Sequence, residues 1–368
     1  MHRALQLAAL GSGRTSPNPL VGALVLDASG CLVGEGFHAR AGEPHAEVGA
    51  LAQAGERARG GTLVVTLEPC CHHGRTPPCS EAVIAAGVAR VVLAMRDPNP
   101  RVDGGGIARL RAAGIAVIEG VLAVEAEALN APFLHRLATR RPLGILKWAM
   151  SLDGRTALPN GASQWISGPR ARGWVHQLRS QVDAVIVGGG TVRADDPLLT
   201  SRGQGNPEPL RVVISRGLDL PATARLWDTT EARTLVAHGP EAPPAAREAI
   251  DRLAAAAADG ALERLELPAC EPRALLEALA ERGCNQVLWE CGADLAAAAL
   301  RQGCVQQIAA VIAPKLLGGV AARTPLGDLG LESLEGAELW QPRGLLPLGP
   351  DLVWHLQAPQ PNAERGNG

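Results

Sequence analysis

The sequence predicts an α/β protein built from two domains. Its length of 368 residues exceeds what a single hydrophobic core usually supports. Short apolar runs typical of strands alternate with helical patterns along most of the chain, as in layered α/β domains. After Arg140-Arg141-Pro142 this alternation starts afresh. We therefore expect a first domain over residues 1–140, a second over 141–357 and a flexible tail over 358–368.

Hydrophobic periodicity, with glycine and proline as breaks, predicts the individual elements. In the first domain we expect strands at 21–26, 31–37, 62–67, 88–95 and 115–119. Helices are expected there at 1–10, 45–58, 79–86, 107–113 and 121–137. In the second domain we expect strands at 144–150, 184–187, 210–215, 233–237 and 286–289. The helices expected there are 169–180, 245–258, 272–282 and 295–301.

Composition argues against several classes of protein. A net charge of −2 gives no basic field for nucleic acid, and 2% aromatic residues leave few platforms for stacking bases. The apolar stretch 5–10 is too short for a signal sequence, and no apolar run reaches membrane-spanning length. Eight cysteines scattered through a long chain favour free thiols and a metal site. We expect a cytoplasmic protein without nucleic-acid or membrane partners.

A group of metal-binding residue types in the first domain predicts a catalytic zinc site. His45, Cys70 and Cys79 offer one imidazole and two thiolates, which leave a fourth position on zinc open. At the start of a helix, Glu47 lies close enough to reach a water on the metal. Zinc lowers the pKa of such a water and the carboxylate shuttles its proton. His-x-Glu followed by Pro-Cys and a further Cys is the pattern of the zinc deaminases.

Other interpretations of this pattern stay open. A single His-Ala-Glu is usually an ordinary helix start, and a single cysteine is usually a buried apolar residue. A structural zinc module would need a fourth ligand, for which Cys71, His72 and His73 are candidates. A nucleic-acid or nucleoside base deaminase with an inactive second domain is the other alternative. That class separates its cysteines by two residues, whereas eight separate Cys70 from Cys79.

Two strand-to-helix turns in the second domain are rich in small residues. One is Gly188-Gly189-Gly190-Thr191 and the other is Cys291-Gly292-Ala293. Neither has the Gly-x-Gly-x-x-Gly fingerprint of dinucleotide-binding domains, and a glycine triplet alone is usually a tight turn. Backbone N–H groups at such turns can bind phosphate, so both turns are compatible with a nucleotide cofactor.

Residues 1–357 resemble one known family, the bifunctional deaminase–reductases of riboflavin biosynthesis. The resemblance rests on ordered motifs such as His45-Ala46-Glu47-Val48 and Lys147-Trp148-Ala149-Met150-Ser151-Leu152-Asp153-Gly154. The other motifs lie at 15–22, 68–70, 78–79, 97–100, 190–197 and 313–319. The resemblance implies a cytidine-deaminase-like three-layer domain followed by a dihydrofolate-reductase-like domain. A homo-oligomer is also expected, although the sequence does not show the oligomeric state.

The resemblance also implies the chemistry of each domain. His45, Cys70 and Cys79 would bind one Zn²⁺, and Glu47 would carry protons in the hydrolytic deamination of 2,5-diamino-6-(5-phosphoribosylamino)pyrimidin-4-one. The second domain would use NADPH to reduce the ribose of 5-amino-6-(5-phosphoribosylamino)uracil to ribityl. Contacts with NADPH are expected from Ala149, Trp165, Thr191, Asp195, Ser215, Gly292, Ala293, Asp294, Leu295, Ala296, Ala297 and Ala298. Contacts with the phosphorylated pyrimidine substrate are expected from Ser163, Arg179, Leu199, Arg202 and Glu290.

Several arginines and one cysteine refine these expectations. Arg179 and Arg202 are expected to converge on the substrate phosphate, because a planar guanidinium meets a dianion with two parallel donors. Arg193 or Arg216 could meet the 2′-phosphate of NADPH. Cys291 departs from the family, in which many members have glycine, and we expect this small residue to be tolerated.

Overall fold

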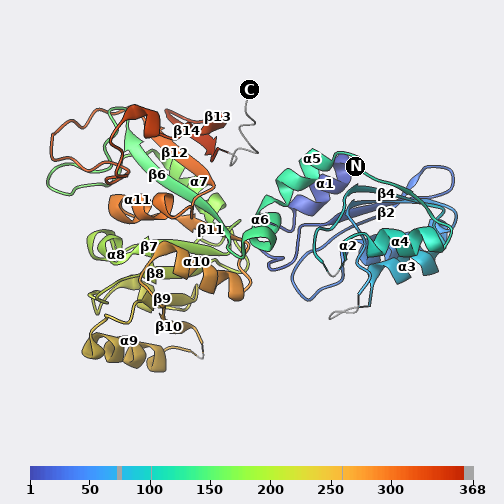
Figure 1. Cartoon of the computed structure of the whole chain (residues 1–368), viewed down its shortest axis with the longest axis horizontal. Coiled ribbons are helices and arrows are strands. Elements are labelled where there is room, and N and C mark those ends of the chain that lie inside the picture. The colour runs from blue at the N-terminus through green and yellow to red at the C-terminus, as the bar shows by residue number, and fades with distance from the viewer. Residues whose placement is uncertain (73–76, 101, 259, 360–368) are drawn as a thin grey trace. The chain divides into compact units, whose positions relative to one another are not determined.

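The chain forms two compact units, Met1–Arg140 and Arg141–Gly368. The structure is a computed structural model that describes residues 1–72, 77–100, 102–258 and 260–359 (Figure 1). The tail expected over 358–368 falls outside the described residues from residue 360 onward. Within the described parts of the chain, no helix is long and apolar enough to cross a membrane.

The first unit contains a five-stranded mixed sheet with the order β2-β1-β3-β4-β5. Its strands are β1 (Gly22–Leu26), β2 (Leu32–Phe37), β3 (Thr62–Leu67), β4 (Arg90–Met95) and β5 (Ala116–Ile118). Strand β1 runs antiparallel to β2 and β3, whereas β3, β4 and β5 are parallel. Leu67 pairs with Met95, so the segments that follow β3 and β4 leave the sheet side by side.

Helices cover both faces of this sheet. They are α1 (His2–Ala9), α2 (Ala46–Ala54), α3 (Cys79–Ala86), α4 (Gly105–Ala112), α5 (Ala123–Leu129) and α6 (Ala131–Thr139). Alternate strand residues face opposite sides, so Val25 packs with α2, α3 and α4 while Leu24 packs with α1. Leu67 and Ala94 pack with Ala126 of α5 on the second face. The result is the three-layer arrangement expected from the sequence.

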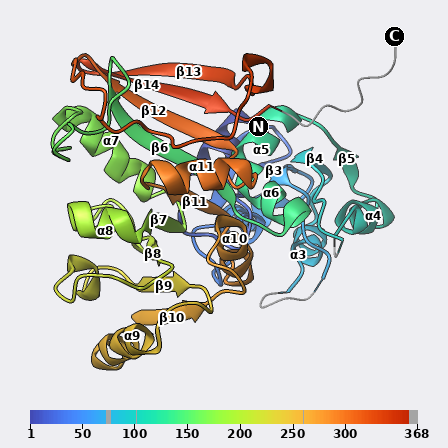
Figure 2. The same cartoon turned by 60° about the vertical axis from the view of Figure 1, so that its left-hand side comes forward.

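The second unit is organised by a nine-stranded sheet with the order β10-β9-β8-β7-β11-β6-β12-β14-β13. Strands β10 and β13 form its opposite edges (Figures 1 and 2). The strands are β6 (Leu143–Ser151), β7 (Ala184–Gly188), β8 (Leu210–Ile214), β9 (Thr234–His238), β10 (Leu262–Glu266), β11 (Gln286–Trp289), β12 (Gln307–Ala313), β13 (Gln341–Leu348) and β14 (Asp351–Gln357). All neighbours from β10 to β12 are parallel, and β14 is antiparallel to β12 and β13.

The helices of the second unit connect its parallel strands. They are α7 (Pro169–Arg179), α8 (Gly189–Asp195), α9 (Pro244–Ala256), α10 (Pro272–Glu281) and α11 (Ala293–Arg301). The main core lies between the sheet and helices α10 and α11, and fully buried Trp289 is its largest side chain. The indole N–H of Trp289 donates to the carbonyl of Cys304 at 3.1 Å, which satisfies its polar atom.

The structure adds four strands that the sequence pattern does not predict, β10, β12, β13 and β14. Edge strand β10 lacks an apolar run, because three of its five residues are charged, namely Glu263, Arg264 and Glu266. Strand β12 contains three alanines, which favour helices. The other edge strand, β13, contains Pro342 and Pro347, which are found in strands mainly at edges and bulges.

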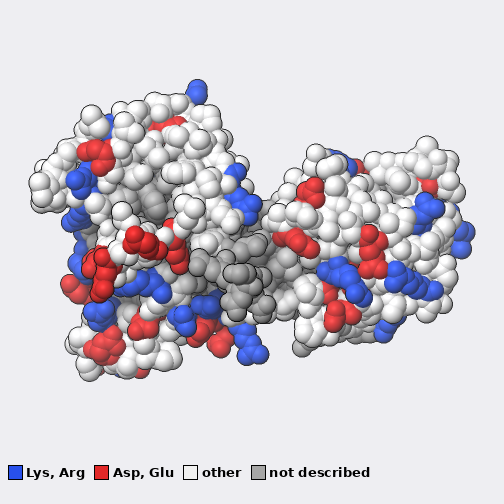
Figure 3. Space-filling view, turned by 45° about the horizontal axis from the view of Figure 1, so that its top comes forward, with Lys and Arg blue, Asp and Glu red and all other residues white. Residues whose placement is uncertain are grey.

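Charged side chains of both signs are interspersed over the face of the molecule shown in Figure 3. Arginine pairs with acidic residues in both units, as in Arg3 with Glu35 and Arg264 with Asp251. This distribution fits the net charge of −2 and gives no single-sign surface on that face.

Close approach between α2 and β2 positions the residues at the start of α2. A Cβ atom on Gly34 would collide with the carbonyl of Ala50, and one on Gly36 with the carbonyl of Ala46. These two glycines lie two residues apart and therefore on one face of the strand. Because α2 begins directly after His45, this packing fixes where the imidazole and Glu47 lie.

Gly36→Ala should therefore destabilise the first unit by about 1–3 kcal/mol, because overpacking forces the backbones apart. Thermal unfolding measures the change. Gly49→Ala on α2 is the matched control, since its Cβ would have no neighbour closer than the Cα of Gly36 at 3.8 Å. That variant should be neutral or slightly stabilising. Equal stability of the two variants would contradict the packing argument.

Candidate active sites

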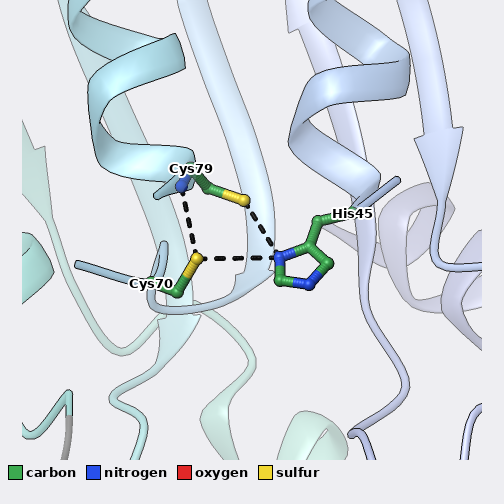
Figure 4. A group of neighbouring side chains, drawn as sticks. All are labelled: His45, Cys70 and Cys79. Carbon is green, nitrogen blue, oxygen red and sulfur yellow. Dashed lines mark hydrogen bonds between the residues drawn. The ribbon is translucent and has the colours of Figure 1, made fainter. Parts of the chain in front are cut away.

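A metal-binding group forms where β3 ends and helices α2 and α3 begin. His45, Cys70 and Cys79 place their ligand atoms within 4.8 Å of one another (Figure 4). His45 Nδ1 lies 3.1 Å from Cys79 Sγ and 3.6 Å from Cys70 Sγ. These separations suit one ion with ligand distances of about 2.0–2.3 Å.

The Cys70 and Cys79 thiols are hydrogen-bonded to each other, which favours a thiolate at Cys70. The hydrogen bond with Cys79, together with contacts from His45, lowers the pKa of Cys70 to about 4 despite its burial. Its Sγ also accepts the backbone N–H of Cys79 at 3.2 Å, at the positive end of α3. The same pairing raises the pKa of Cys79. A bound cation would replace the shared proton, so the donors fit zinc.

Glu47 lies beside this group with one unpaired oxygen. Its side chain is buried, and Oε2 has no hydrogen-bond partner among the residues that the structure describes. Burial raises the pKa of Glu47 to about 7. A carboxyl group with such a pKa can both accept and return a proton near neutral pH.

Glu68 positions the Cys70 loop, although the sequence interpretation gave it no role. Its buried carboxylate accepts the backbone N–H groups of Asp97 at 3.3 Å, Gly104 at 3.1 Å and Ile107 at 3.1 Å. These bonds tie the end of β3 to the segment after β4 and to the start of α4. The available signal was a glutamate directly between an apolar strand and Pro69-Cys70.

His38 is a second residue that the sequence interpretation did not select. Its ring packs edge-on against His45 with centroids 5.3 Å apart. Its Nε2 lies 3.1 Å from Nδ2 of Asn18, which belongs to the conspicuous segment 15–22. The pair therefore flanks the imidazole ligand. A single histidine directly after a strand gives no sequence pattern from which this position beside His45 could be predicted.

The structure limits the candidates for a fourth protein ligand. Cys71 and His72 are described, and neither joins the group of His45, Cys70 and Cys79. His73 lies outside the described residues. The three ligands that the structure does bring together leave room for a water or substrate atom.

A charged cluster around Glu290 forms the candidate site of the second unit. Glu290 follows β11 and accepts from Arg179 Nε at 2.6 Å and Nη2 at 3.1 Å. Lys147 Nζ lies 3.4 Å from its Oε2. Burial alone would raise the pKa of Glu290, but the charges and hydrogen bonds of Arg179 and Lys147 outweigh burial and lower it to about 2. Lys147 is the member of this cluster that the sequence interpretation did not select.

The two arginines expected at the substrate phosphate are placed differently. Arg179 uses two nitrogens for Glu290, and its Nη1 donates to the carbonyl of Thr200 at 3.0 Å. Arg202 is exposed and has no hydrogen-bond or ion-pair partner among the described residues. These three bonds leave further N–H groups on Arg179, and the donors of Arg202 are all available, so the convergence of both arginines on the substrate phosphate stays a prediction. Leu199 is buried just before Arg202.

Most of the residues expected to contact NADPH follow the ends of β7, β8 and β11. Gly188 and Gly292 cap helices α8 and α11, and a Cβ on Gly292 would lie 3.9 Å from Thr191 Oγ1. Gly189 approaches Ser215 so closely that its Cβ would lie 2.7 Å from Ser215 Oγ. The small residues thus bring two helix starts together. Ser215, Ala296 and Ala297 differ from the other residues of this set, because all three are buried.

The segment before α7 presents Trp165 beside this region. Trp165 is 60% exposed, and the guanidinium of Arg172 lies 4.5 Å from the centre of its ring. Lys315 Nζ donates to the carbonyl of Trp165 at 2.7 Å, and Ser163 Oγ donates to Asp195 at 3.3 Å. These contacts hold an exposed indole in place, as a stacking surface requires.

The structure also shows the surroundings of four other residues that the sequence interpretation named. Arg193 pairs with Asp219, whereas Arg216 has no hydrogen-bond or ion-pair partner within the described parts of the chain. Burial raises the pKa of Cys291 to about 12, so this thiol stays neutral. Ala149 lies on β6, the neighbour of β11 and β12.

The lowered pKa of Glu290 predicts a pH-dependent stability. The folded state favours the carboxylate, so its contribution of about 3 kcal/mol is present above pH 5 and is lost as the pH falls toward 2. Denaturant unfolding between pH 6 and pH 3 should show a shallower pH slope for Glu290→Gln than for the unmodified protein. Glu248→Gln, at an exposed position, is the control and should keep the original slope. Identical slopes for both variants would refute the prediction.

Family models match both parts of the chain. Residues 142–354 match the RibD C-terminal domain, and residues 1–95 match the cytidine and deoxycytidylate deaminase zinc-binding region. The chain is 49% identical to the riboflavin biosynthesis protein RibD of Synechocystis over 96% of this chain and 94% of that protein. It is 43% identical to RibD of Escherichia coli over 97% of this chain and 98% of that protein.

Solved structures agree with these matches over the whole chain. Acinetobacter baumannii RibD superposes with a TM-score of 0.87 at 39% identity, covering 98% of both chains. A diaminohydroxyphosphoribosylaminopyrimidine deaminase/5-amino-6-(5-phosphoribosylamino)uracil reductase from Thermotoga maritima gives a TM-score of 0.85 at 35% identity, covering 97% of both. The chain belongs to the RibD family of bifunctional riboflavin biosynthesis enzymes, with a zinc-binding deaminase domain and an NADPH-dependent reductase domain.

Proposed function

We propose that this chain catalyses two successive reactions of riboflavin biosynthesis on one phosphorylated pyrimidine. The first is hydrolytic deamination of 2,5-diamino-6-(5-phosphoribosylamino)pyrimidin-4-one. The second is reduction of the ribose of 5-amino-6-(5-phosphoribosylamino)uracil to ribityl. The proposal rests mainly on one observation: three side chains of the types that bind zinc lie together, beside a buried Glu47 whose Oε2 has no hydrogen-bond partner among the described residues.

In the deaminase site, the protein's task is to hold the metal and to move protons. We assign His45, Cys70 and Cys79 as the ligands of one Zn²⁺. Zinc bound there supplies Lewis-acid activation of the water that attacks the amidine carbon. Glu47 takes a proton from that water through its carboxylate and returns it to the exocyclic amine, which leaves as ammonia. Burial excludes bulk water from this exchange.

In the reductase site, NADPH supplies the hydride, and the protein orients the sugar and balances charge. We propose that the small-residue turns at Thr191, Ser215 and Gly292 bind the cofactor, beside the indole of Trp165. The substrate would be held by Ser163, Arg179, Leu199, Arg202 and Glu290. The buried ion pair between Glu290 and Arg179 would hold these substrate-binding side chains in place, because separating the two would leave a buried charge without a partner.

The limits of the two domains and the surroundings of the enzyme are also proposals. We assign residues 1–140 to the deaminase domain and 141–357 to the reductase domain, supported by the two compact units and by the family models. Eight free cysteines support a reducing, cytoplasmic location. A homo-oligomer without nucleic-acid or membrane partners remains our expectation, which light scattering of the purified protein tests for its oligomeric part.

Deamination should require zinc and Glu47, whereas reduction should require neither. All three ligands lie in the first unit, so chelated protein should release no ammonia yet still oxidise NADPH when given the deaminated intermediate. Glu47→Gln should bind zinc stoichiometrically and release ammonia about 10²- to 10⁴-fold more slowly, since proton transfer of this kind contributes that much.

Metal content by atomic absorption separates the two causes of lost activity. A Glu47→Gln protein without zinc would mean that the residue holds the metal and not the proton. A structural zinc module predicts no ammonia release by the unmodified protein. Loss of both activities on chelation would contradict the independence of the sites.

Arg202→Ala should weaken the phosphorylated intermediate strongly. Charge-assisted hydrogen bonds contribute roughly 1.5–3 kcal/mol, so kcat/KM should fall about ten- to a hundredfold. The loss should lie mainly in KM, because the phosphate is held before and during hydride transfer alike. The KM for NADPH should stay unchanged. Arg252→Ala, an exposed arginine of α9, is the control. An unchanged KM for the intermediate would exclude Arg202 as the phosphate anchor.

A further inference from the structure

The loop that carries Arg202 has an unusual backbone. Leu199, Thr200 and Ser201 are buried at 2%, 1% and 0% exposure, whereas Arg202 is exposed. The backbones of Leu199 and Arg202 have φ of 59° and 56°. A left-handed conformation is unfavourable for a residue with a Cβ and persists only where neighbouring contacts hold it. The direction of the Arg202 side chain therefore depends on contacts made by its neighbours.

Glu208 makes those contacts. Its Oε2 accepts the backbone N–H of Ser201 at 2.6 Å, and its Oε1 accepts the hydroxyl of Ser201 at 2.6 Å and the N–H of Gly203 at 3.0 Å. These donors flank Arg202 on both sides in the chain. Ser201 Oγ in turn accepts the N–H of Gly205 at 2.7 Å, which extends the same network.

The loop is held from its other side by the reductase cluster. Arg179 Nη1 donates to the carbonyl of Thr200 at 3.0 Å, so one cation and one carboxylate hold the two sides of the same peptide group, between Thr200 and Ser201. Glu208 also lies close enough to Arg179 for a favourable charge interaction. The exposed guanidinium of Arg202 is thus the end of a chain of contacts that begins at Glu290 and Glu208.

We infer that Glu208 is a positioning residue for recognition of the substrate phosphate, acting through Arg202. The inference rests on the proposed role of Arg202 and adds a residue that no motif assigns. Both oxygens of Glu208 are already used by the loop, and a carboxylate would repel a phosphate dianion. Direct contact of Glu208 with the phosphate is therefore unfavourable, and its effect must pass through the loop.

Glu208→Ala should raise the KM for the phosphorylated intermediate about tenfold while kcat and the KM for NADPH change less than about threefold, as expected for a lost uniform-binding contact. With the dephosphorylated intermediate the same variant should match the unmodified enzyme. Glu208→Gln keeps one acceptor oxygen but turns the other into a donor that faces a loop N–H, so it should restore only part of the affinity. Glu248→Ala, which removes an equal charge from α9, is the control and should change none of these values.

A double-mutant cycle shows whether Glu208 acts through Arg202. In the Arg202→Ala background, Glu208→Ala should add less than about a twofold further rise in KM, because coupled residues are not additive. A full additional tenfold rise would overturn the inference, and so would a normal KM for Glu208→Ala alone while Arg202→Ala shows its loss. If Arg202→Ala itself is without effect, the proposed phosphate anchor has failed rather than the loop argument.

Ser201→Ala provides a second test if Glu208→Ala folds poorly. It removes one donor to Glu208 and the acceptor for Gly205 while it keeps the charge. The inference expects the same selective rise in KM for the phosphorylated intermediate, smaller than for Glu208→Ala, in a protein with native thermal unfolding. A folded Ser201→Ala protein with unchanged KM would overturn it.

Discussion

Buried carboxylates set the constraint on which both active regions depend. An ionised carboxylate removed from water is costly unless it is paired or hydrogen-bonded. Glu68 directly follows β3 and is satisfied by three backbone N–H groups from the segment after β4 and from α4. Glu290 directly follows β11 and is satisfied by Arg179 and Lys147. Each carboxylate thus fixes the carboxyl end of a central strand, and each candidate site lies at that end of its sheet.

Glu47 departs from this rule, and the departure distinguishes it from the structural glutamates. It is as buried as Glu68, at 3% exposure each, yet its Oε2 has no hydrogen-bond partner among the described residues. An unpaired buried polar group costs roughly 1–3 kcal/mol. Close packing of α2 on Gly34 and Gly36 keeps the side chain there despite that cost. Such uncompensated groups are expected where a ligand completes the site.

Local sequence patterns predicted most helices and strands, whereas strands that form only by pairing with distant segments were not predicted. The strand over 62–67 and the helix over 79–86 have the predicted bounds in β3 and α3, because each carries its own periodicity and end signals. Strand β12 was not predicted, because it becomes a strand by pairing with β6, which lies more than 150 residues earlier in the chain. Alanines in that segment favour a helix locally, and tertiary pairing overrides the preference. The same holds for β13, whose prolines are tolerated only because it lies at an edge.

The residues of the candidate sites show the same contrast between local patterns, which could be predicted, and distant contacts, which could not. The grouping of His45, Cys70 and Cys79 could be predicted because imidazole and thiol groups are chemically distinctive and their order is local. The tasks of individual arginines could not, because this chain is rich in arginine and partners come from other elements. Arg179, expected on a phosphate, is engaged by Glu290 and also lies close to Glu208, so these two carboxylates balance the charges of Arg179 and Lys147. The exposed Arg202 therefore adds the positive charge that can attract an anionic substrate, which its sequence context does not reveal.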